Sequence, residues 1–142
     1  MHDSYNLQRF VDAQKDVFER VCAEISAGDK RTHWMWFIFP QIAGLGTSPM
    51  AQRYAVHSLD EARAYLAHPI LGARYQECVA ALEQLTDTTA QAVFGGIDAM
   101  KLRSSLTLFA MASGLPMFDA AIERWFAGKR DPATIERLGP HR

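Results

Sequence analysis

Several marks of familiar protein classes are missing from this sequence. It has only two cysteines, and its five histidines include no His-x3-His pair, a spacing that zinc sites commonly use. No apolar run approaches the roughly 18 residues that span a bilayer, and the first residues lack the basic-then-apolar pattern of a signal peptide. We therefore expect no metal site, no cofactor, no association with membranes and a cytoplasmic location.

The sequence also lacks a strong net charge. The formal net charge of -1 and the pI near 6.5 leave no cluster of Lys and Arg of the kind that nucleic acids require, so we expect no nucleic-acid partner. The basic pairs Lys30-Arg31 and Lys129-Arg130 are interpreted as solvated loop ends. Cys22 and Cys78 each fall on the apolar side of a predicted helix, which is typical of reduced thiols in a core.

Alternating β-branched residues, the pattern of a strand, are absent over any run of five or more residues. Apolar residues instead recur at helix spacing, and 142 residues with 49% hydrophobic content suffice for one core. We predict a single all-α, orthogonal multi-helical domain of about six to eight helices over residues 1–142, frayed at about 1–5 and 139–142. The expected helices cover residues 7–25, 49–56, 58–68, 69–85, 90–94, 98–112, 116–126 and 132–138.

Helix starts carry recognisable capping residues. Ser48 and Asp131 each precede a proline, the arrangement of an N-cap followed by proline in the first turn. Ser58 and Glu61 have the spacing of a capping box. His68, directly before a proline, is interpreted as a capping or packing residue.

The most distinctive stretch is the aromatic segment, residues 31–41, which leads into a glycine-spaced turn. Two of the three tryptophans and two of the eight phenylalanines lie within six consecutive positions, with no amphipathic period that would leave one side wet. We expect an irregular segment that is buried among helices and carries His33 and Gln41 inward at its ends. Gln14, on the apolar stripe of the first helix, should be partly buried and find partners on the irregular backbone near Gln41.

Residues of this segment have both structural and functional interpretations. Trp34 and Trp36 suit a core, but either ring could instead be a stacking platform for a flat ligand, as in the recognition of bases. His33 either has its ring nitrogens satisfied structurally or serves as a general acid or base near neutral pH. Gln41 is interpreted as an amide that braces the backbone.

A second candidate region lies in the predicted helix 98–112. Lys101, Ser104 and Ser105 share one face of it, and Arg103 flanks them. Serine has a low helix propensity in the interior of a helix, so two adjacent serines there indicate a structural or functional role. Either small residues let another helix approach closely, or a polar face lines a cleft where the hydroxyls and Lys101 hold an anionic or sugar-like group.

Motifs in a fixed order run through nearly the whole chain. They are Phe10-x3-Gln14, His33-Trp-Met-Trp-Phe-Ile-Phe-Pro-Gln41, Gly44-Leu-Gly46-x-Ser48, Tyr54-Ala, Glu61-Ala-x-Ala-Tyr-Leu66, His68-Pro-x-Leu-Gly72, Asp98-x2-Lys101-Leu-x-Ser-Ser-x-Thr107-Leu-Phe109 and Asp131-x2-Thr134. In these motifs the sequence resembles the family of domains of unknown function numbered 1810. The resemblance implies an all-α, single-domain, mostly bacterial protein with no assigned activity.

Two further likenesses bear on function. Members of that family often carry the label calpastatin, but a calpain inhibitor of that kind is a long, repetitive, disordered chain rich in proline and lysine, unlike this compact aromatic sequence. The helical layout is also similar to the NADAR domains, which process ADP-ribose. The glutamate that those domains use has no counterpart in residues 49–54, where the comparable positions offer only Ala51 and Gln52.

Two functions are compatible with these residues. In the first, the chain binds or processes a small nucleotide- or ADP-ribose-like ligand in a helical cleft where His33, Gln41 and Lys101 converge. In the second, it is a non-catalytic protein-interaction module without a sizeable cleft, and its polar residues are structural. The ligand contacts expected in the first case are stacking by Trp34 or Trp36, phosphate neutralisation by Lys101 and Arg103, hydrogen bonds from Gln41, Ser104 and Ser105, and proton transfer by His33.

Overall fold

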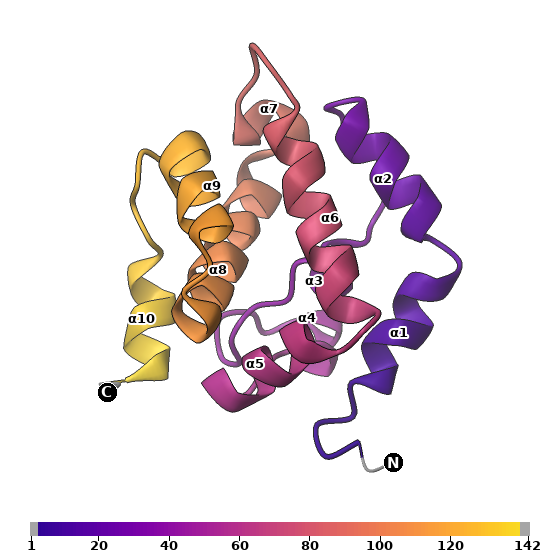
Figure 1. Cartoon of the computed structure of the whole chain (residues 1–142), viewed down its shortest axis with the longest axis vertical. Coiled ribbons are helices and arrows are strands. Elements are labelled where there is room, and N and C mark those ends of the chain that lie inside the picture. The colour runs from indigo at the N-terminus through magenta and orange to yellow at the C-terminus, as the bar shows by residue number, and fades with distance from the viewer. Residues whose placement is uncertain (1–2, 140–142) are drawn as a thin grey trace.

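The computed structural model describes residues 3–139, and within them the chain forms ten helices and no strand. The all-α prediction is confirmed. In Figure 1, α8 and α9 lie side by side and α5 runs across the lower ends of α6 and α8. The fraying expected at the chain ends falls mainly outside the described residues. The helices are α1 (Gln8–Lys15), α2 (Phe18–Ser26), α3 (Met35–Ile38), α4 (Pro49–Arg53), α5 (Leu59–Ala67), α6 (Leu71–Glu83), α7 (Ala90–Phe94), α8 (Gly96–Ser113), α9 (Pro116–Phe126) and α10 (Pro132–Leu138).

The helix count in residues 3–139 exceeds the predicted six to eight for two local reasons. The helix expected over residues 7–25 is broken at Asp16 and Val17, where the amide of Val17 donates to the carbonyl of Gln14. The break lets α1 pack against α3 while α2 packs against α6, which one straight helix could not do. In addition, part of the aromatic segment forms the single helical turn α3, although no amphipathic period marks it.

Local capping follows the predicted pattern. The side chains of Ser48 and Asp131 each accept the backbone amide three residues further along, at 3.1 and 3.2 Å. The ring Nδ1 of His68 accepts the amides of Ile70 and Leu71 at 3.1 and 3.3 Å. These contacts satisfy amides that have no partner within their own helix, so each fixes where a helix begins.

The aromatic segment is the centre of the core, as predicted. Trp34 and Phe39 are fully buried, and the Phe39 ring centroid lies 5.5 Å from that of Tyr75 and 6.2 Å from that of Phe94. Burying each large apolar side chain contributes about 1.5–3 kcal/mol, so this cluster supplies much of the stability. Trp36 is the exception, because its ring is only half-buried.

The corner between α5 and α6 is unusually tight. A Cβ atom at Gly72 would lie 2.0 Å from the carbonyl oxygen of Leu66. Only glycine lets the two helix backbones approach this closely. The tight corner holds α6 against the aromatic segment.

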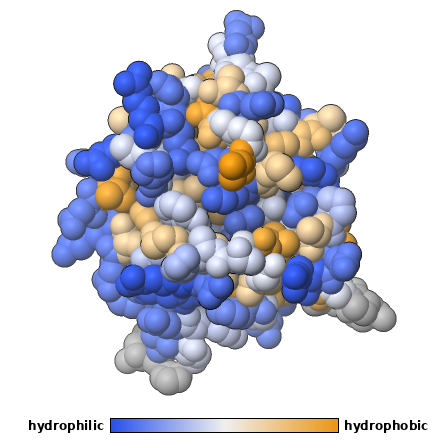
Figure 2. Space-filling view, turned by 180° about the vertical axis from the view of Figure 1, so that it is seen from behind, coloured by the Kyte–Doolittle hydropathy of each residue, from blue (hydrophilic) through white to orange (hydrophobic). Residues whose placement is uncertain are grey.

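The surface shown in Figure 2, the face opposite that of Figure 1, carries hydrophobic residues in small patches between polar ones. No helix within residues 3–139 is both long and apolar enough to cross a membrane. Both cysteines are free thiols. Burial raises the pKa of the Cys78 thiol, which keeps it protonated and unreactive.

Candidate functional site

Glu24 braces the start of the aromatic segment. Its buried carboxylate accepts the backbone amides of Arg31 and Thr32 at 2.8 and 3.0 Å. It also accepts the hydroxyl of Thr32 at 2.7 Å and the indole N–H of Trp34 at 2.9 Å. Burial pushes the pKa of Glu24 upward, but these hydrogen bonds outweigh it and hold the pKa at about 2. The carboxylate is therefore ionised at neutral pH, with its oxygens fully engaged.

Next to this brace, two lysines share one aspartate. The ammonium of Lys30 lies 2.9 Å from an Asp98 oxygen and 4.9 Å from the centre of the Trp34 ring. The ammonium of Lys101 lies 3.6 Å from the other Asp98 oxygen and 5.1 Å from the centre of the Trp36 ring. Both cations thus stand over aromatic faces, an arrangement favoured by the ring quadrupole. We call these five residues the lysine–tryptophan cluster.

The two lysines of the cluster differ in how far they are engaged. The Lys30 side chain is only 6% exposed, so its interpretation as a solvated loop end is wrong. It donates to the carbonyl of Thr32 at 2.7 Å and forms the shorter ion pair with Asp98. Lys101 has only the longer contact and is more exposed, so its ammonium keeps donors for another partner.

The other residues expected near Lys101 lie in different surroundings. His33 is exposed, whereas Trp34 is fully buried and presents no free face. The guanidinium of Arg103 donates to the carbonyls of Lys129 and Arg130 at 2.8 and 2.9 Å, so it anchors the loop before α10. Of the residues predicted to form one site, the structure brings Trp36 and Lys101 together.

The serines of α8 face the interior. The hydroxyl of Ser104 donates to the Asp131 carboxylate at 2.7 Å, and the Ser105 hydroxyl lies 2.9 Å from that of Tyr75. The hydroxyl of Thr107 accepts the amide of Asp131 at 2.9 Å. Mid-α8 hydroxyls therefore join the helix to α6 and to the start of α10.

Gln14 is buried more completely than expected and lies beside the predicted partner region. Its amide donates to the carbonyl of Phe37 at 2.7 Å and to the hydroxyl of Tyr65 at 3.0 Å. Its oxygen accepts Arg74 at 3.3 Å. The amide therefore links α1, α3, α5 and α6.

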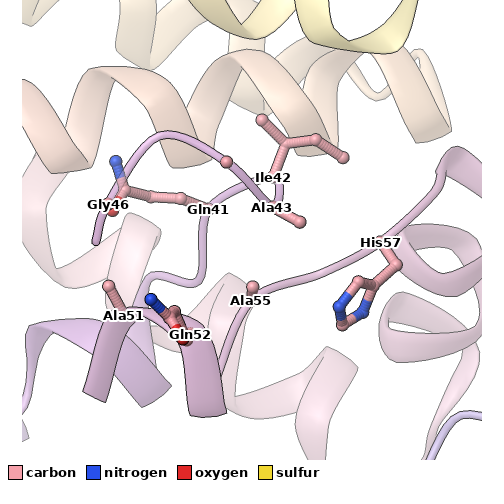
Figure 3. A pocket seen from close by; sticks show the side chains of 9 residues that line it. Gln41, Ile42, Ala43, Gly46, Ala51, Gln52, Ala55 and His57 are labelled. Carbon is pink, nitrogen blue, oxygen red and sulfur yellow. The ribbon is translucent and has the colours of Figure 1, made fainter. Parts of the chain in front are cut away.

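Gln41 lies in a separate hollow, which we call the glutamine pocket. Figure 3 shows it between the glycine turn, α4 and the strand-like residues that follow α4. A backbone bridge pairs residues 42 and 56 beneath it, where the amide of Ala43 donates to the carbonyl of Val56 at 2.7 Å. The pocket has a volume of about 340 Å³ and is lined by Gln41, Ile42, Ala43, Gly44, Gly46, Ala51, Gln52, Ala55 and His57. Neither His33 nor Lys101 is among these residues.

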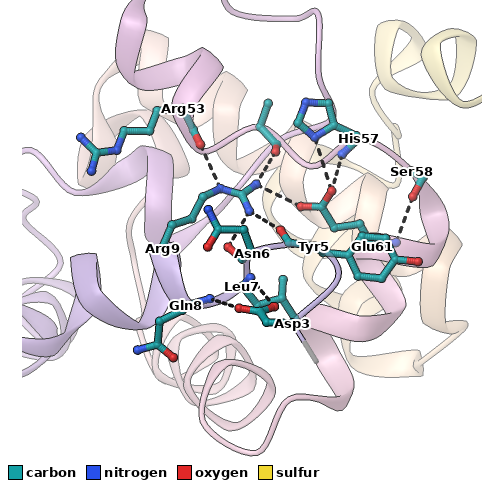
Figure 4. Close-up of polar contacts among 11 residues, drawn as sticks. Asp3, Tyr5, Asn6, Leu7, Gln8, Arg9, Arg53, His57, Ser58 and Glu61 are labelled. Atoms are coloured by element: carbon teal, nitrogen blue, oxygen red, sulfur yellow. Dashed lines mark hydrogen bonds and ion pairs between the residues drawn. The ribbon is translucent and has the colours of Figure 1, made fainter. Parts of the chain in front are cut away.

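His57, which lines this pocket, is also the last member of a chain of charged groups, shown in Figure 4. Glu61 is buried and pairs with the guanidinium of Arg9 at 3.0 Å. Its second oxygen accepts the amide of His57 at 3.1 Å and lies 3.4 Å from the Nδ1 atom of the same residue. Only half of the predicted capping box forms, because Ser58 accepts the Glu61 amide while the Glu61 carboxylate turns to Arg9 and His57.

Arg9 is held by more than this ion pair. Its guanidinium also donates to the carbonyls of Tyr5, Asn6, Arg53 and Ala55, at 2.6 to 2.9 Å. The guanidinium thus ties the N-terminal segment to the residues after α4.

For metal sites the structure gives no candidate: within residues 3–139 no three His, Cys, Asp or Glu side chains gather closely enough to hold an ion.

None of the predicted site residues was Glu24, Lys30 or His57, and the pairing of Arg9 with Glu61 was not foreseen. Glu24 had one visible signal, because it lies beside Ile25 and one turn after Val21 on the apolar face of α2. An acid in that position is buried and needs donors. Lys30 and the Arg9–Glu61 pair leave no local signal in the sequence, since their partners lie 68 and 52 positions away. His57 lies four residues before its partner Glu61, but the sequence pattern assigns Glu61 to a capping box with Ser58.

The comparisons with known proteins concern family and fold. The family model described as "Protein of unknown function (DUF1810)" matches residues 4–138. No curated protein gives a significant match. Among solved structures, the chain is similar to the conserved hypothetical protein Rv1873 from Mycobacterium tuberculosis, with 44% identity and a TM-score of 0.96. The match covers 98% of this chain and 100% of that one.

Proposed function

Because the chain belongs to the DUF1810 family of proteins of unknown function, its activity has to be inferred from its own residues, and we propose that it binds a small, anionic, nucleotide-like ligand. The ligand would lie at the lysine–tryptophan cluster. The observation that carries the proposal is the Lys101 ammonium over the half-buried Trp36 ring, 5.1 Å from its centre. A cation beside an aromatic face suits a molecule that joins a phosphate to a flat ring.

The surrounding charges support this assignment. Lys30 neutralises Asp98 at close range, so the aspartate does not tie up Lys101. Lys101 is the less closely paired of the two lysines, so its ammonium is the group that an anion can approach. A base would stack on the Trp36 ring once the Lys101 ammonium, which lies over that ring, moves aside to meet the phosphate. Stacking on an aromatic side chain is worth about 1–3 kcal/mol per base.

His33 is the residue that would exchange a proton with a bound ligand. It is exposed and lies three residues before Trp36 in the chain. An imidazole changes its charge closest to neutral pH among the ordinary side chains, which suits it to acid or base work. Processing of an ADP-ribose-like ligand would therefore depend on His33, whereas binding would depend on Lys101.

Calorimetric titration with AMP and with ADP-ribose tests the proposal. We expect both to bind, and Lys101→Gln to weaken binding at least about tenfold, because a hydrogen bond to a charged group is lost. Lys129→Gln is the matched control, since it removes the same charge from an exposed residue in the loop between α9 and α10. Absence of heat and of a thermal shift with either ligand would reject the proposal.

An interaction module is the second candidate, and one observation favours it. On the first turns of α8, Ile97 is 76% exposed and Met100 is 67% exposed. Met100 also lines a hollow together with Trp125 and Phe126. Exposed apolar groups of this kind suit a protein partner. A photo-crosslinker at position 97 should then trap a partner in cells, a crosslinker at the exposed Glu136 should not, and Met100→Ser should abolish trapping.

A further inference from the structure

We propose that the glutamine pocket is a second binding site, for a small uncharged polyol of pentose size. This site shares no residue with the lysine–tryptophan cluster, so the inference is independent of the proposed function. It rests on the hydrogen-bonding character of His57, on the chemistry of the lining, and on the size and rigidity of the pocket.

The contact with Glu61 fixes which nitrogen of His57 is free. Glu61 is ion-paired with Arg9, and a carboxylate can only accept hydrogen bonds. We assign the proton of the neutral ring to the Nδ1 atom, 3.4 Å from the Glu61 oxygen, because only a protonated nitrogen can pair with a carboxylate. The Nε2 atom is then an acceptor, available to a hydroxyl in the pocket. Figure 3 shows the ring at one side of the pocket.

The remaining lining matches hydroxyl groups better than phosphates. Apart from His57, no residue that lines the pocket has an ionisable side chain. Gln41 and Gln52 carry amides, which both donate and accept, as hydroxyls do. One Gln52 N–H is engaged by the carbonyl of Thr47 at 2.9 Å, which holds that amide in place and leaves its oxygen to accept.

Ile42, three alanines and two glycines form the rest of the wall, and this apolar surface suits the C–H face of a sugar. Gly46 keeps this wall close: a Cβ atom there would lie 2.6 Å from the Cβ atom of Ala51 on α4. Gly44 has a φ of +98°, a conformation that favours glycine. Its carbonyl oxygen accepts a hydrogen bond from the guanidinium of Arg137 in α10 at 3.1 Å. The glycine turn, residues 44–46, is thus held by α4 on one side and by Arg137 of α10 on the other.

Volume limits the ligand. The pocket of about 340 Å³ lies at the lower end of the range for small-molecule sites, roughly 300–1,000 Å³. A monosaccharide fits this range, whereas a dinucleotide would need more room. The lining and the volume therefore agree on a single sugar-sized molecule.

Titration of the ¹⁵N-labelled protein with D-ribose tests the inference. We expect saturable shifts of the amide signals of Gly44 and Gly46 and of the side-chain amides of Gln41 and Gln52. The Nε2 resonance of His57 should move as well, because it gains a hydrogen bond. His57→Ala should weaken binding about tenfold, as expected for the loss of one well-placed hydrogen bond.

Two controls make the outcome decisive. Gln84→Ala removes an exposed polar side chain at the end of α6, outside both proposed sites, and should leave the ribose titration unchanged. His57→Ala should unfold at the same temperature as the parent, because the His57 side chain is 66% exposed. No saturable shift, shifts confined to other residues, or equal binding by His57→Ala would each overturn the inference.

Discussion

The middle of α8 and its first turns both carry polar residues, but the fold engages them differently. Ser104 and Ser105 have their hydroxyls paired with other helices. Lys101, one turn earlier, keeps an ammonium with a single long contact to a carboxylate. A polar residue can therefore contribute to binding only when the fold leaves one of its hydrogen-bond donors or acceptors unpaired. Substitutions of the interior groups should therefore lower stability, whereas substitution of Lys101 should mainly weaken binding.

Glu24→Ala should have the largest effect on the interior side of this comparison. It removes the acceptor for two backbone amides, a hydroxyl and the Trp34 indole. We expect a loss of about 3 kcal/mol in the free energy of unfolding, measured by urea denaturation. Glu19→Ala, on an exposed position of the same helix, should change it by less than about 0.5 kcal/mol. Equal losses in the two variants would contradict the role given to Glu24.

Acid should remove the same stabilisation in the parent. The pKa of Glu24 is about 2 in the folded protein against an ordinary value of 4.5, so its contribution is complete above about pH 4.5. It declines as the pH falls from there towards 2, by at most about 1.4 kcal/mol per pH unit for one proton. Urea denaturation at a series of pH values should show a shallower decline in Glu24→Gln. A decline of the same slope in both proteins would mean that other carboxylates dominate.

Ser105→Ala should have an intermediate effect. The hydroxyl of Tyr75 is fully buried and would lose its partner, at a cost of about 1–2 kcal/mol. Thermal unfolding measures the loss, and binding of AMP should not change. Ser26→Ala, at the exposed end of α2, is the control and should leave the unfolding temperature unchanged. Weaker binding of AMP by the Ser105 variant would break the contrast between interior and surface.

Lys101→Gln should have the smallest effect on stability. An ion pair at 3.6 Å with both side chains partly exposed contributes less than about 1 kcal/mol. Urea denaturation should therefore give nearly the parent value, although binding of AMP falls. A loss of stability as large as that of Ser105→Ala would assign Lys101 to the interior group.

Local sequence patterns were enough to predict most of the fold. Helix spacing, the caps at Ser48 and Asp131 and the glycines at helix ends act over a few residues, so they can be recognised without a structure. The burial of the aromatic segment was equally evident, because a stretch this apolar has no side to expose. The break at Asp16 could not be foreseen, since it depends on where α2 meets α6.

Candidate site residues were harder to predict. Spacing placed Lys101 and Ser104 on one face of a helix, but which of them faces a neighbour depends on how α10 docks. Lys30 lies 68 positions before its partner Asp98, and Arg9 lies 52 positions before Glu61. Pairs separated by such distances leave no periodic signal. The glutamine pocket likewise exists only once the glycine turn lies against α4.

The docking of α10 has a consequence for how the molecule is made. Arg137 reaches back 93 positions to the carbonyl of Gly44, and Asp131 anchors the same helix on Ser104. During synthesis the glycine turn therefore lacks its contact with Arg137 until α10 has emerged from the ribosome. A chain that ended shortly before α10 could already assemble its aromatic centre, but its glutamine pocket would lack the contact between Arg137 and Gly44.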